Sequence, residues 1–446
     1  MTNAFTAIDI SKIKTSKIKT SKISSRETEQ SMATRRHPLI PVAGVVSVVA
    51  LIGGLAACSG SNDASGGADA APSTASSRSA SKVSRVAVTL TGGDADVCTV
   101  DNKQAKAGPV TFTVTNQSST AISEVELLND QRIVGEKENL APGLKPVSFT
   151  VTLGGGEYQI YCPGAKTELQ KFTVTGSAAE EPTGSAAQLL ADGTKGYGDY
   201  VDTQVAAMVS AVGTLKKAVD NGDLEAAQTA YAKARPFYEK IESDVDGFVL
   251  PGYKATDNHG NLDYLIDMRA SNLDPKVGWH GFHAVERDLF KRGKITGSTK
   301  KLAAELNTNV KKLSKLVGGL TYKPEDLANG AAGLLEEVQS NKIKGEEESF
   351  SHIDLVDFAG NVEGAEQSFA YLKPGLQKID STLTKQISTR FESTTKMLDG
   401  YRDPDALGGY QIYTAKLRKS DANKLSQNVQ ALQDSLSRLA EKVATA

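Results

Sequence analysis

Three pairs of side chains that commonly bind metal ions recur in the second half of the sequence, each with a spacing of three residues. The pairs are Glu239 and Glu242, His283 and Glu286, and Asp354 and Asp357. On a helix, residues three apart lie one above the other on one face, so the two side chains of each pair converge. One imidazole nitrogen and several carboxylate oxygens form a set of hard ligands that suits Fe(III), Fe(II) or Mn and tolerates Zn.

Each pair also stands beside residues of types that are usually buried, among them Tyr238, Ile241, Leu355 and Phe358. A carboxylate near a core is costly unless a cation neutralises it, so three such pairs in one helical region favour an internal metal site. The plainer alternative is a solvated helix face or, for the imidazole, a hydrogen bond at the edge of the core. Without metal we expect the carboxylates to repel one another, so removing Glu286 should slightly stabilise the metal-free protein.

Helical periodicity, which must position these pairs, extends from about residue 187 to the end of the chain. Predicted helices, separated by glycine or proline, cover about 187–219, 224–246, 278–292, 297–317, 324–340, 350–371, 375–399 and 409–443. Long helices joined by short connections imply antiparallel bundles, so we predict an all-α domain over 187–446. A glycine- and proline-rich segment, 246–261, is predicted to be a long loop, and Pro374 to separate two helices.

The part of the chain before these helices alternates apolar with polar residues instead. Four such runs are 86–90, 110–114, 147–151 and 171–174, and turn-forming residues separate them. This pattern predicts a small antiparallel β-sandwich over residues 84–176, joined to the helical domain by a linker over 177–186. The chain is therefore expected to be multidomain, with an all-β domain ahead of an all-α one.

Four short motifs in combination resemble those of imelysin-like domains, and residues 84–446 as a whole resemble the EfeO family. The motifs are Tyr238-Glu239-x-Ile241-Glu242, Ile266-Asp267-x-Arg269, Gly281-Phe282-His283-x-x-Glu286 and Ser351-His352-x-Asp354-Leu355-x-Asp357-Phe358. The resemblance implies a cupredoxin-like sandwich followed by an imelysin-like helical-bundle domain that binds metal. The ligands it implies are His283, Glu286, Glu239, Glu242 and Asp267, with Asp354 as a further partner and Asp357 as a spare candidate.

The EfeO family comprises extracytoplasmic components of iron-uptake systems, so the resemblance implies a binding protein rather than an enzyme. Such a protein would capture iron, as Fe(III) or Fe(II), and pass it to a membrane iron permease, alongside a haem peroxidase of the same system. Zn and Cu are the alternative metals. The formal net charge of −2 gives no basic excess, so nucleic acid is not an expected partner.

Two other function classes compete with iron capture. Imelysin-like domains have been classed among peptidases, but the sequence has no His-Glu-x-x-His motif, and a metallopeptidase needs a general-base glutamate beside its ligands. Some imelysin-like proteins resemble polysaccharide-binding lipoproteins, but carbohydrate clefts usually offer stacked aromatic rings, and this chain has one tryptophan.

The predicted β-domain contains two cysteines, Cys98 and Cys162, and neither histidine nor methionine. A blue-copper site, which needs two histidines and a cysteine, therefore cannot form there. In an oxidising compartment the two cysteines are expected to form a disulfide. The alternative is a second metal site in which the two sulfurs join Glu124 and Glu126, because acidic segments here resemble those associated with metal binding in EfeO cupredoxin domains.

The N-terminal region has the features of a targeting sequence. An apolar run ends in Leu55-Ala-Ala-Cys58, which resembles a bacterial lipoprotein signal with Cys58 as the lipidated residue. We therefore predict a signal peptide over 32–57, followed by a lipidated cysteine and a flexible tether over 58–83. Because a signal peptide stands at the beginning of a protein, residues 1–31 are predicted to be a mis-called start. The mature protein would be held by its lipid at the extracytoplasmic face of the cell membrane, in the periplasm or cell envelope.

Overall fold

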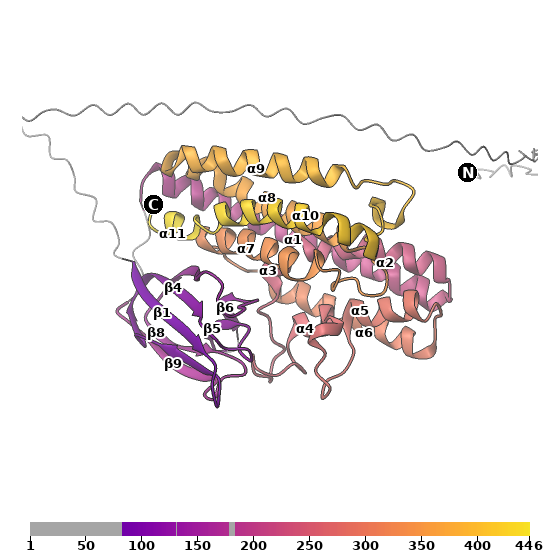
Figure 1. Cartoon of the computed structure of the whole chain (residues 1–446), viewed down its shortest axis with the longest axis horizontal. Coiled ribbons are helices and arrows are strands. Elements are labelled where there is room, and N and C mark those ends of the chain that lie inside the picture. The colour runs from indigo at the N-terminus through magenta and orange to yellow at the C-terminus, as the bar shows by residue number, and fades with distance from the viewer. Residues whose placement is uncertain (1–82, 131, 178–182) are drawn as a thin grey trace, which may run out of the picture. The chain divides into compact units, whose positions relative to one another are not determined.

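The computed structural model describes residues 83–130, 132–177 and 183–446, all within one compact unit. A β-domain comes first in the chain and a helical domain follows, as the sequence predicts (Figure 1). The predicted start, the signal peptide, the lipidated Cys58 and nearly all of the tether lie outside the described residues. None of the helices in the described part of the chain is long and apolar enough to cross a membrane.

Two sheets make up the β-domain. Its strands are β1 (Ser84–Thr91), β2 (Val97–Val100), β3 (Gln104–Lys106), β4 (Gly108–Asn116), β5 (Val125–Asn129), β6 (Arg132–Lys137), β7 (Val147–Leu153), β8 (Gly156–Tyr161) and β9 (Leu169–Thr175). One sheet has the order β2-β1-β4-β7 and the other the order β3-β9-β8-β5-β6. The four alternating runs predicted from the sequence fall in β1, β4, β7 and β9.

The prediction of a purely antiparallel sandwich is wrong, because β1 pairs in parallel with β4, and β3 pairs in parallel with β9. After β2 the chain crosses to the second sheet as β3 and returns to the first as β4, so β4 runs in the same direction as β1. Alternating polarity indicates which side chains face the core, but it contains no information on strand direction.

Alternate residues of these strands fill a core between the two sheets. In β1, Val86, Val88 and Leu90 are at most 2% exposed. The rings of Phe112 in β4 and Phe149 in β7 are stacked, with their centroids 5.0 Å apart. This packing explains why one side chain in two is large and apolar along each strand.

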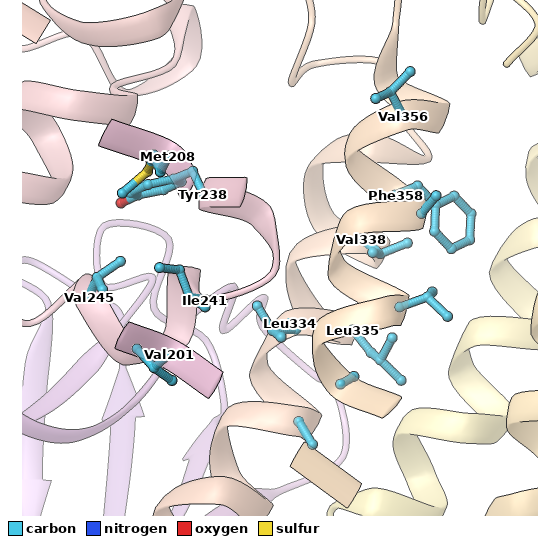
Figure 2. Close-up of a cluster of buried hydrophobic side chains, with 14 of the residues drawn as sticks. Val201, Met208, Tyr238, Ile241, Val245, Leu334, Leu335, Val338, Val356 and Phe358 are labelled. Atoms are coloured by element: carbon cyan, nitrogen blue, oxygen red, sulfur yellow. The ribbon is translucent and has the colours of Figure 1, made fainter. Parts of the chain in front are cut away.

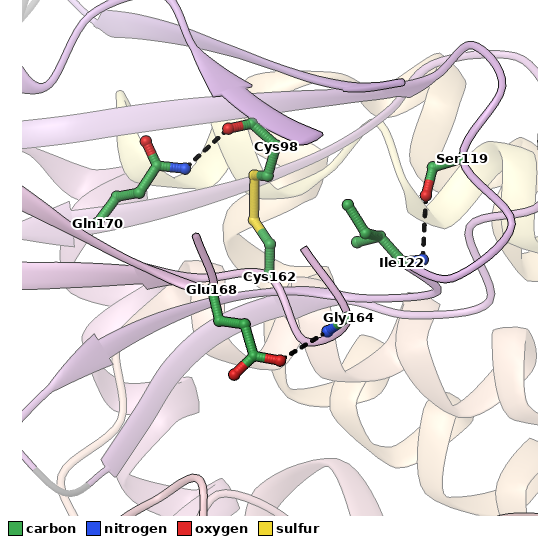
Figure 3. The surroundings of a disulfide bond; sticks show 7 residues. All are labelled: Cys98, Ser119, Ile122, Cys162, Gly164, Glu168 and Gln170. Carbon is green, nitrogen blue, oxygen red and sulfur yellow. Dashed lines mark hydrogen bonds between the residues drawn. A yellow bond between two sulfur atoms is a disulfide. The ribbon is translucent and has the colours of Figure 1, made fainter. Parts of the chain in front are cut away.

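A disulfide joins Cys98 in β2 to Cys162, which follows β8, and so links the two sheets (Figure 3). The predicted disulfide is therefore confirmed. Gln170 donates a hydrogen bond of 2.8 Å to the carbonyl oxygen of Cys98, which ties β9 to the same corner. The cross-link closes a segment with a sequence separation of 64 residues.

The helical domain is built from long helices with shorter pieces between them. The α-helices are α1 (Ser185–Asn221), α2 (Leu224–Glu239), α3 (Glu242–Val245), α4 (Leu262–Asp267), α5 (Gly281–Glu286), α6 (Gly297–Val317), α7 (Pro324–Glu337), α8 (Asp354–Ile379), α9 (Ser381–Asp399), α10 (Ala415–Leu436) and α11 (Ala440–Ala444). Two π-helical turns, η2 (Arg287–Lys291) and η3 (Val338–Lys342), follow α5 and α7 directly. Two 3₁₀ turns, η1 (Ala270–Asn272) and η4 (Leu407–Gly409), complete the domain. Helix α1 packs against α2, α6 and α8.

Apolar neighbours of the candidate ligands belong to the main core of this domain (Figure 2). Tyr238, Ile241 and Phe358 are at most 1% exposed, as their residue types predict. In Figure 2, Tyr238 lies beside Met208, whereas Phe358 lies on the side of Val338 and Leu335. Because these residues fix the end of α2 and the starts of α3 and α8, the charged residues next to them are also held inside the protein.

The helix predicted over 224–246 is interrupted in the structure. Helix α2 ends at Glu239, Ile241 adopts a φ of −132° and a ψ of 10°, and α3 begins at Glu242. Glu239 and Glu242 therefore lie on either side of a bend rather than on one continuous helical face. The predicted loop over 246–261 is confirmed, since this described segment forms an isolated bridge but no helix.

Other helix boundaries also differ from the prediction. Pro374 does not end a helix but lies inside α8, where the buried Leu372 and Leu376 continue the apolar stripe on both sides. The packing of that stripe offsets the hydrogen bond that a proline removes. The helix predicted over 409–443 begins later, at Ala415, and is divided into α10 and α11.

Candidate metal centre

The side chains predicted to bind metal come from five helices of the helical domain. Glu239 lies at the end of α2, Glu242 at the start of α3, Asp267 at the end of α4, His283 and Glu286 in α5, and Asp354 and Asp357 in the first turn of α8. All of them are buried, and the most accessible, Glu242, is only 7% exposed. The fold therefore gathers these groups away from water, where each charge needs a partner.

Three groups of candidate ligand atoms have all their members within 4.8 Å of one another. The groups are Asp267 with His283 and Glu347, His283 with Glu286 and Glu348, and Glu239 with Glu347 and Asp357. We call these seven residues and the buried cations among them the centre. The spare candidate, Asp357, thus belongs to a group, whereas Glu242 and Asp354 belong to none of these three. Asp354 instead accepts the backbone N–H of Glu348 at 3.2 Å, and Glu242 accepts a side-chain N–H of Asn361 at 3.3 Å.

The imidazole of His283 has one nitrogen held by a carboxylate and the other facing the centre. Its Nδ1 lies 3.0 Å from Oε2 of Glu286, at hydrogen-bond distance. Its Nε2 lies 3.6 Å from Oδ1 of Asp267 and 3.4 Å from Oε1 of Glu347, and makes no hydrogen bond of good geometry. A histidine oriented in this way by a carboxylate presents its other nitrogen to a metal ion.

Gly281 explains how α5 reaches this position. Its φ is +69°, and a Cβ atom added there would lie only 2.1 Å from the carbonyl oxygen of Ile266. The start of α5 therefore touches the end of α4 with no room for a side chain. This contact places His283 beside Asp267.

Glu286 has both of its carboxylate oxygens engaged. Oε1 accepts the backbone N–H groups of Phe350 and Ser351, at 2.8 and 2.7 Å. Oε2 is the atom that holds His283. Glu286 therefore joins α5 to the segment before α8 and orients the imidazole, which leaves it less able to bind a metal ion directly than the sequence suggests.

Glu347 and Glu348 are members of the centre that sequence reasoning missed. They lie between η3 and α8 and are 1% and 0% exposed. Glu347 belongs to two of the three ligand groups. The available signal was the acidic run 346–348 just ahead of Ser351-His352, but such a run in a predicted connection has the composition of a solvated loop.

Arg235 is the largest fully buried side chain of the centre and was also missed. Its guanidinium forms ion pairs with Glu239 and Asp267 and lies 3.1 Å from oxygens of both Glu347 and Glu348. A fixed fork of five N–H donors suits this arrangement. The feature of the sequence that could have identified Arg235 is its position four residues before Glu239, because a helix brings side chains with this spacing together.

Two further cations enter the cluster from other segments. Nζ of Lys342, at the end of η3, lies 3.0 Å from Oε2 of Glu239 and 3.4 Å from Oε2 of Glu347. Arg269, which belongs to the same motif as Asp267, lies 2.6 Å from Glu337 and 3.4 Å from Glu347. The expected repulsion between the carboxylates is therefore partly offset, because buried cations are interleaved with them.

Burial shifts the ionisation of several carboxyl groups toward the neutral acid. It raises the pKa of Asp267 to about 7, although the neighbouring Arg235 opposes the shift. Burial together with the charge of Glu286 raises the pKa of Glu348 to about 7. Burial and the charge of Glu348 do the same for Asp354, whose pKa also rises to about 7. These groups therefore exchange protons near neutral pH.

Glu347 and His283 are shifted the opposite way, toward their charged forms. Burial alone would raise the pKa of Glu347, but Lys342 and Arg269 hold it well below its usual range. Burial alone would lower the pKa of His283, but its contacts with Glu286 and Glu347 hold it well above the ordinary value. A metal ion that binds Nε2 of His283 must therefore displace a proton.

Several buried polar atoms of the centre have no hydrogen-bond partner. They include Nε2 of His283, Oε2 of Glu239 and Oδ1 of Asp357. Buried polar atoms in native proteins are rarely left without a partner, so such a concentration at one place requires an explanation. A cation shared by these groups would supply it, and the donor set of one nitrogen and several oxygens fits a hard metal ion.

Comparison with known proteins places this arrangement in a family. The imelysin family model, which is also named as a peptidase family, matches residues 193–439. The protein named "Iron uptake system component EfeO" in Escherichia coli is 33% identical over 371 residues, which cover 82% of this chain and 93% of that protein. The protein of the same name in Yersinia pestis is 35% identical over 350 residues, covering 76% of this chain and 89% of its own. The chain belongs to the EfeO family.

In this EfeO-family chain, the imelysin match contains every residue of the buried centre, from Arg235 to Asp357. The candidate second metal site lies in the β-domain, and the structure removes two of its four expected ligands. Because Cys98 and Cys162 form a disulfide, neither sulfur is a thiolate ligand. Only the carboxylates of Glu124 and Glu126 remain of that site.

Glu126 is a buried residue of β5, and its Oε2 has no hydrogen-bond partner. Burial, with the charges of Glu124 and Asp246, raises its pKa to about 9. Within the described β-domain, no three candidate ligand atoms meet as closely as they do in the helical centre. Among the described residues, the helical centre therefore fits a metal ion better than the candidate site in the β-domain does.

A cavity of about 370 Å³ lies next to the centre of this EfeO-family chain. Glu242 and Arg269 line it from the side of the centre, and Glu136 and Glu138 line it from β6 and the residue after it. Burial and neighbouring carboxylates raise the pKa of both Glu136 and Glu138 well above the ordinary value. The cavity therefore brings acidic groups of both domains within reach of the centre.

Proposed function

We propose that this protein binds iron at the buried centre of its helical domain and is the capture component of an iron-uptake system. The observation that carries the proposal is His283, whose Nδ1 is held by Glu286 while its Nε2 faces Asp267 and Glu347 without a hydrogen bond. Membership of the EfeO family supports it, because the relatives are named as iron uptake system components.

The proposed ligands are Nε2 of His283 and carboxylate oxygens of Asp267 and Glu347, with Glu239 and Asp357 available through the group that shares Glu347. This set is hard, so it suits Fe(III) or Fe(II) and tolerates Zn, whereas the absence of a thiolate or thioether from the set makes Cu(I) a poor cargo. Glu286, Glu242 and Asp354, also predicted as ligands, are assigned to the surrounding layer that orients the ligands.

We further propose that the protein delivers its iron to a membrane iron permease, together with a haem peroxidase of the same system. The lipoprotein-like run ending in Cys58 supports a lipid anchor at the extracytoplasmic face of the membrane. Replacement of Cys58 by alanine is then expected to release the protein from the membrane fraction of cells. Retention of the Cys58→Ala protein in that fraction would contradict the anchor but not the metal site.

The burial of the centre argues against the alternative of peptide hydrolysis. His283 and Glu286 are at most 1% exposed, so a polypeptide cannot approach them without a large rearrangement. Glu286 also has both oxygens engaged, which disfavours it as a general base. Trp279, the residue a carbohydrate site would use, packs against Phe350 and Arg287, so a polysaccharide cleft is not favoured either.

A metal titration of paired histidine variants tests the proposal. His283→Ala removes the proposed nitrogen ligand, so it should weaken binding of Fe(II), measured anaerobically, and of Zn(II) by at least about tenfold. His280→Ala is the matched control, because His280 lies three residues earlier and pairs with Glu305 at 3.0 Å instead. Equal metal binding by His283→Ala and wild type would refute the assigned centre, and peptidase activity in the same sample would favour the alternative.

A further inference from the structure

We propose that Lys342 is a tethered counter-ion of the centre: its ammonium group neutralises ligand carboxylates before iron arrives, and withdraws from them when iron binds. This inference rests on the proposed iron-binding function and adds to it a residue that sets how tightly the cargo is held. Its consequence is a weaker but more reversible site, as delivery to a second protein requires.

The position of Lys342 makes it a direct competitor of the metal ion. It ends η3, a π-helical turn, and its side chain is fully buried. Nζ lies 3.0 Å from Oε2 of Glu239, 3.4 Å from Oε2 of Glu347 and 3.8 Å from Oε2 of Glu242. Glu239 and Glu347 both belong to groups of candidate ligands. An ion bound by these carboxylates would share them with a positive charge only a few ångströms away.

Lys342 is held by charge rather than by directed bonds. Although oxygens lie close to it, Nζ makes no hydrogen bond of good geometry, and neither does Oε2 of Glu239. A lysine ammonium is a compact point charge on a flexible stem with four methylene groups. Such a group can leave one set of oxygens for another, such as Glu242, at small conformational cost.

The other buried cations lack this freedom. Arg235 is surrounded by ion-pair partners, including Glu239 and Asp267, and its guanidinium lies 5.0 Å from the ring centroid of Phe282. Its removal would leave many carboxylates without a partner, so it is a permanent part of the centre. Arg269 also lies 3.4 Å from Glu347, but its closer ion pair, at 2.6 Å, is with Glu337, which belongs to none of the three ligand groups. Lys342 is therefore the cation best placed to yield to iron.

A tethered counter-ion makes opposite contributions to the two states of the protein. Without metal, Lys342 compensates buried carboxylates and should stabilise the fold. With metal bound, the same positive charge repels the ion and should lower its affinity. A lysine with a merely structural role would instead stabilise both states, so its removal would weaken metal binding or leave it unchanged.

The test compares Lys342→Met, which keeps the apolar stem but removes the charge, with wild type in the full chain. Lys240→Met is the matched control, because Lys240 pairs with Glu363 outside the ligand groups. The measurements are affinity for Fe(II), measured anaerobically, and for Zn(II), the rate of metal release to excess EDTA, and melting with and without metal. We expect Lys342→Met to bind at least about tenfold more tightly, to release metal more slowly, and to melt lower without metal.

Lys342→Arg provides a second variant if the methionine protein does not fold. It keeps the charge but adds a fork that can bind two carboxylates at once, so it should be harder to displace and should weaken metal binding. Unchanged or weaker binding by a folded Lys342→Met protein would overturn the counter-ion role, as would unchanged or tighter binding by Lys342→Arg. A wild-type protein that binds no metal would instead overturn the proposed function.

Discussion

Oε2 of Glu286 lies 3.0 Å from Nδ1 of His283, while Oε1 of the same carboxylate accepts two backbone N–H groups from the segment before α8. One side chain therefore fixes both the imidazole and the chain that carries Glu347. This relationship reverses the effect expected from charge repulsion alone, because removal of Glu286 leaves three donors without an acceptor.

Glu286→Ala is predicted to destabilise the metal-free protein by about 3 kcal/mol, because buried hydrogen-bond donors lose the carboxylate that accepts from them in the wild type. It should also weaken metal binding by about 10- to 100-fold, because the imidazole loses its orientation. Urea unfolding in EDTA and metal titration measure the two effects. A more stable metal-free Glu286→Ala protein would mean that repulsion dominates after all.

Glu347→Gln is predicted to weaken metal binding by at least about tenfold, because Glu347 faces Nε2 of His283 and belongs to two ligand groups. The neighbouring Glu346 is exposed, so Glu346→Gln provides a control with the same change of charge one residue away. Metal titration of the two variants distinguishes a ligand from a general effect of negative charge. Equal losses in both would remove Glu347 from the ligand set.

Stability of the metal-free protein is predicted to fall as pH rises from about 4.5 to 8. The folded-state pKa values of Asp267, Asp354 and Glu348 are raised to about 7, so the native state binds more protons than the unfolded chain in this range. The raised pKa of His283 acts in the same direction, because its stabilisation is complete below the unfolded value and is lost as pH rises through the folded one.

The contribution of Glu347 to stability changes with pH in the opposite direction, because its pKa is lowered in the folded state. That contribution is lost only as the pH falls below about 4.5, which is outside this window. Metal affinity should rise with pH, because protons compete for the same atoms. Melting in EDTA and in saturating Zn(II), repeated across the pH range, measures both trends. A metal-free protein whose melting temperature rises steadily from pH 5 to 8 would contradict the assignment.

Gly281→Ala is predicted to cost more than about 2 kcal/mol of stability, because the residue has a positive φ and its new Cβ would overlap the backbone of Ile266. The displacement of α5 should also separate His283 from Asp267 and weaken metal binding. Gly297→Ala is the control, since a Cβ there meets no atom within 4 Å. Equal stability of the two variants would contradict the close contact between α4 and α5.

Replacing both Cys98 and Cys162 with serine is predicted to cost the β-domain about 4 kcal/mol, given the long segment that their disulfide closes. Metal binding at the helical centre should be unchanged. Thiol titration of the wild-type protein should find no free thiol at these two positions before reduction. Loss of metal binding in the double variant would revive the alternative in which the two sulfurs belong to a metal site.

Local patterns in the sequence were sufficient for the parts of the fold that depend on neighbouring residues. The spacing of His283 and Glu286 predicts that they meet, and they do, because one turn of helix α5 contains both. Alternating polarity located four strands, but the direction of β4 depends on a crossing between sheets that no local pattern records. The bend at Ile241 likewise depends on tertiary packing.

The charge balance of the centre was not predictable in the same way. Arg235, Lys342 and Glu347 are long charged residues of the type that usually lies at the surface, and their residue types give no sign of complete burial. Their side chains come together only because α2, η3 and the segment before α8 are neighbours in the fold. The carboxylate motifs therefore predicted where the centre lies in the sequence. The cations that pair with those carboxylates could be identified only from the packing of the folded chain.

The segment 343–353, which carries Glu347 and Glu348, contains no helix or strand in the described structure. Segments that bind a ligand and move with it are drawn from the parts of a protein that open at the lowest free energy. Iron would then enter and leave at the speed of this opening rather than by diffusion through a fixed channel. Amide hydrogen exchange at Phe350 and Ser351, whose N–H groups bind Glu286, would report the frequency of that opening, and bound iron would slow the exchange.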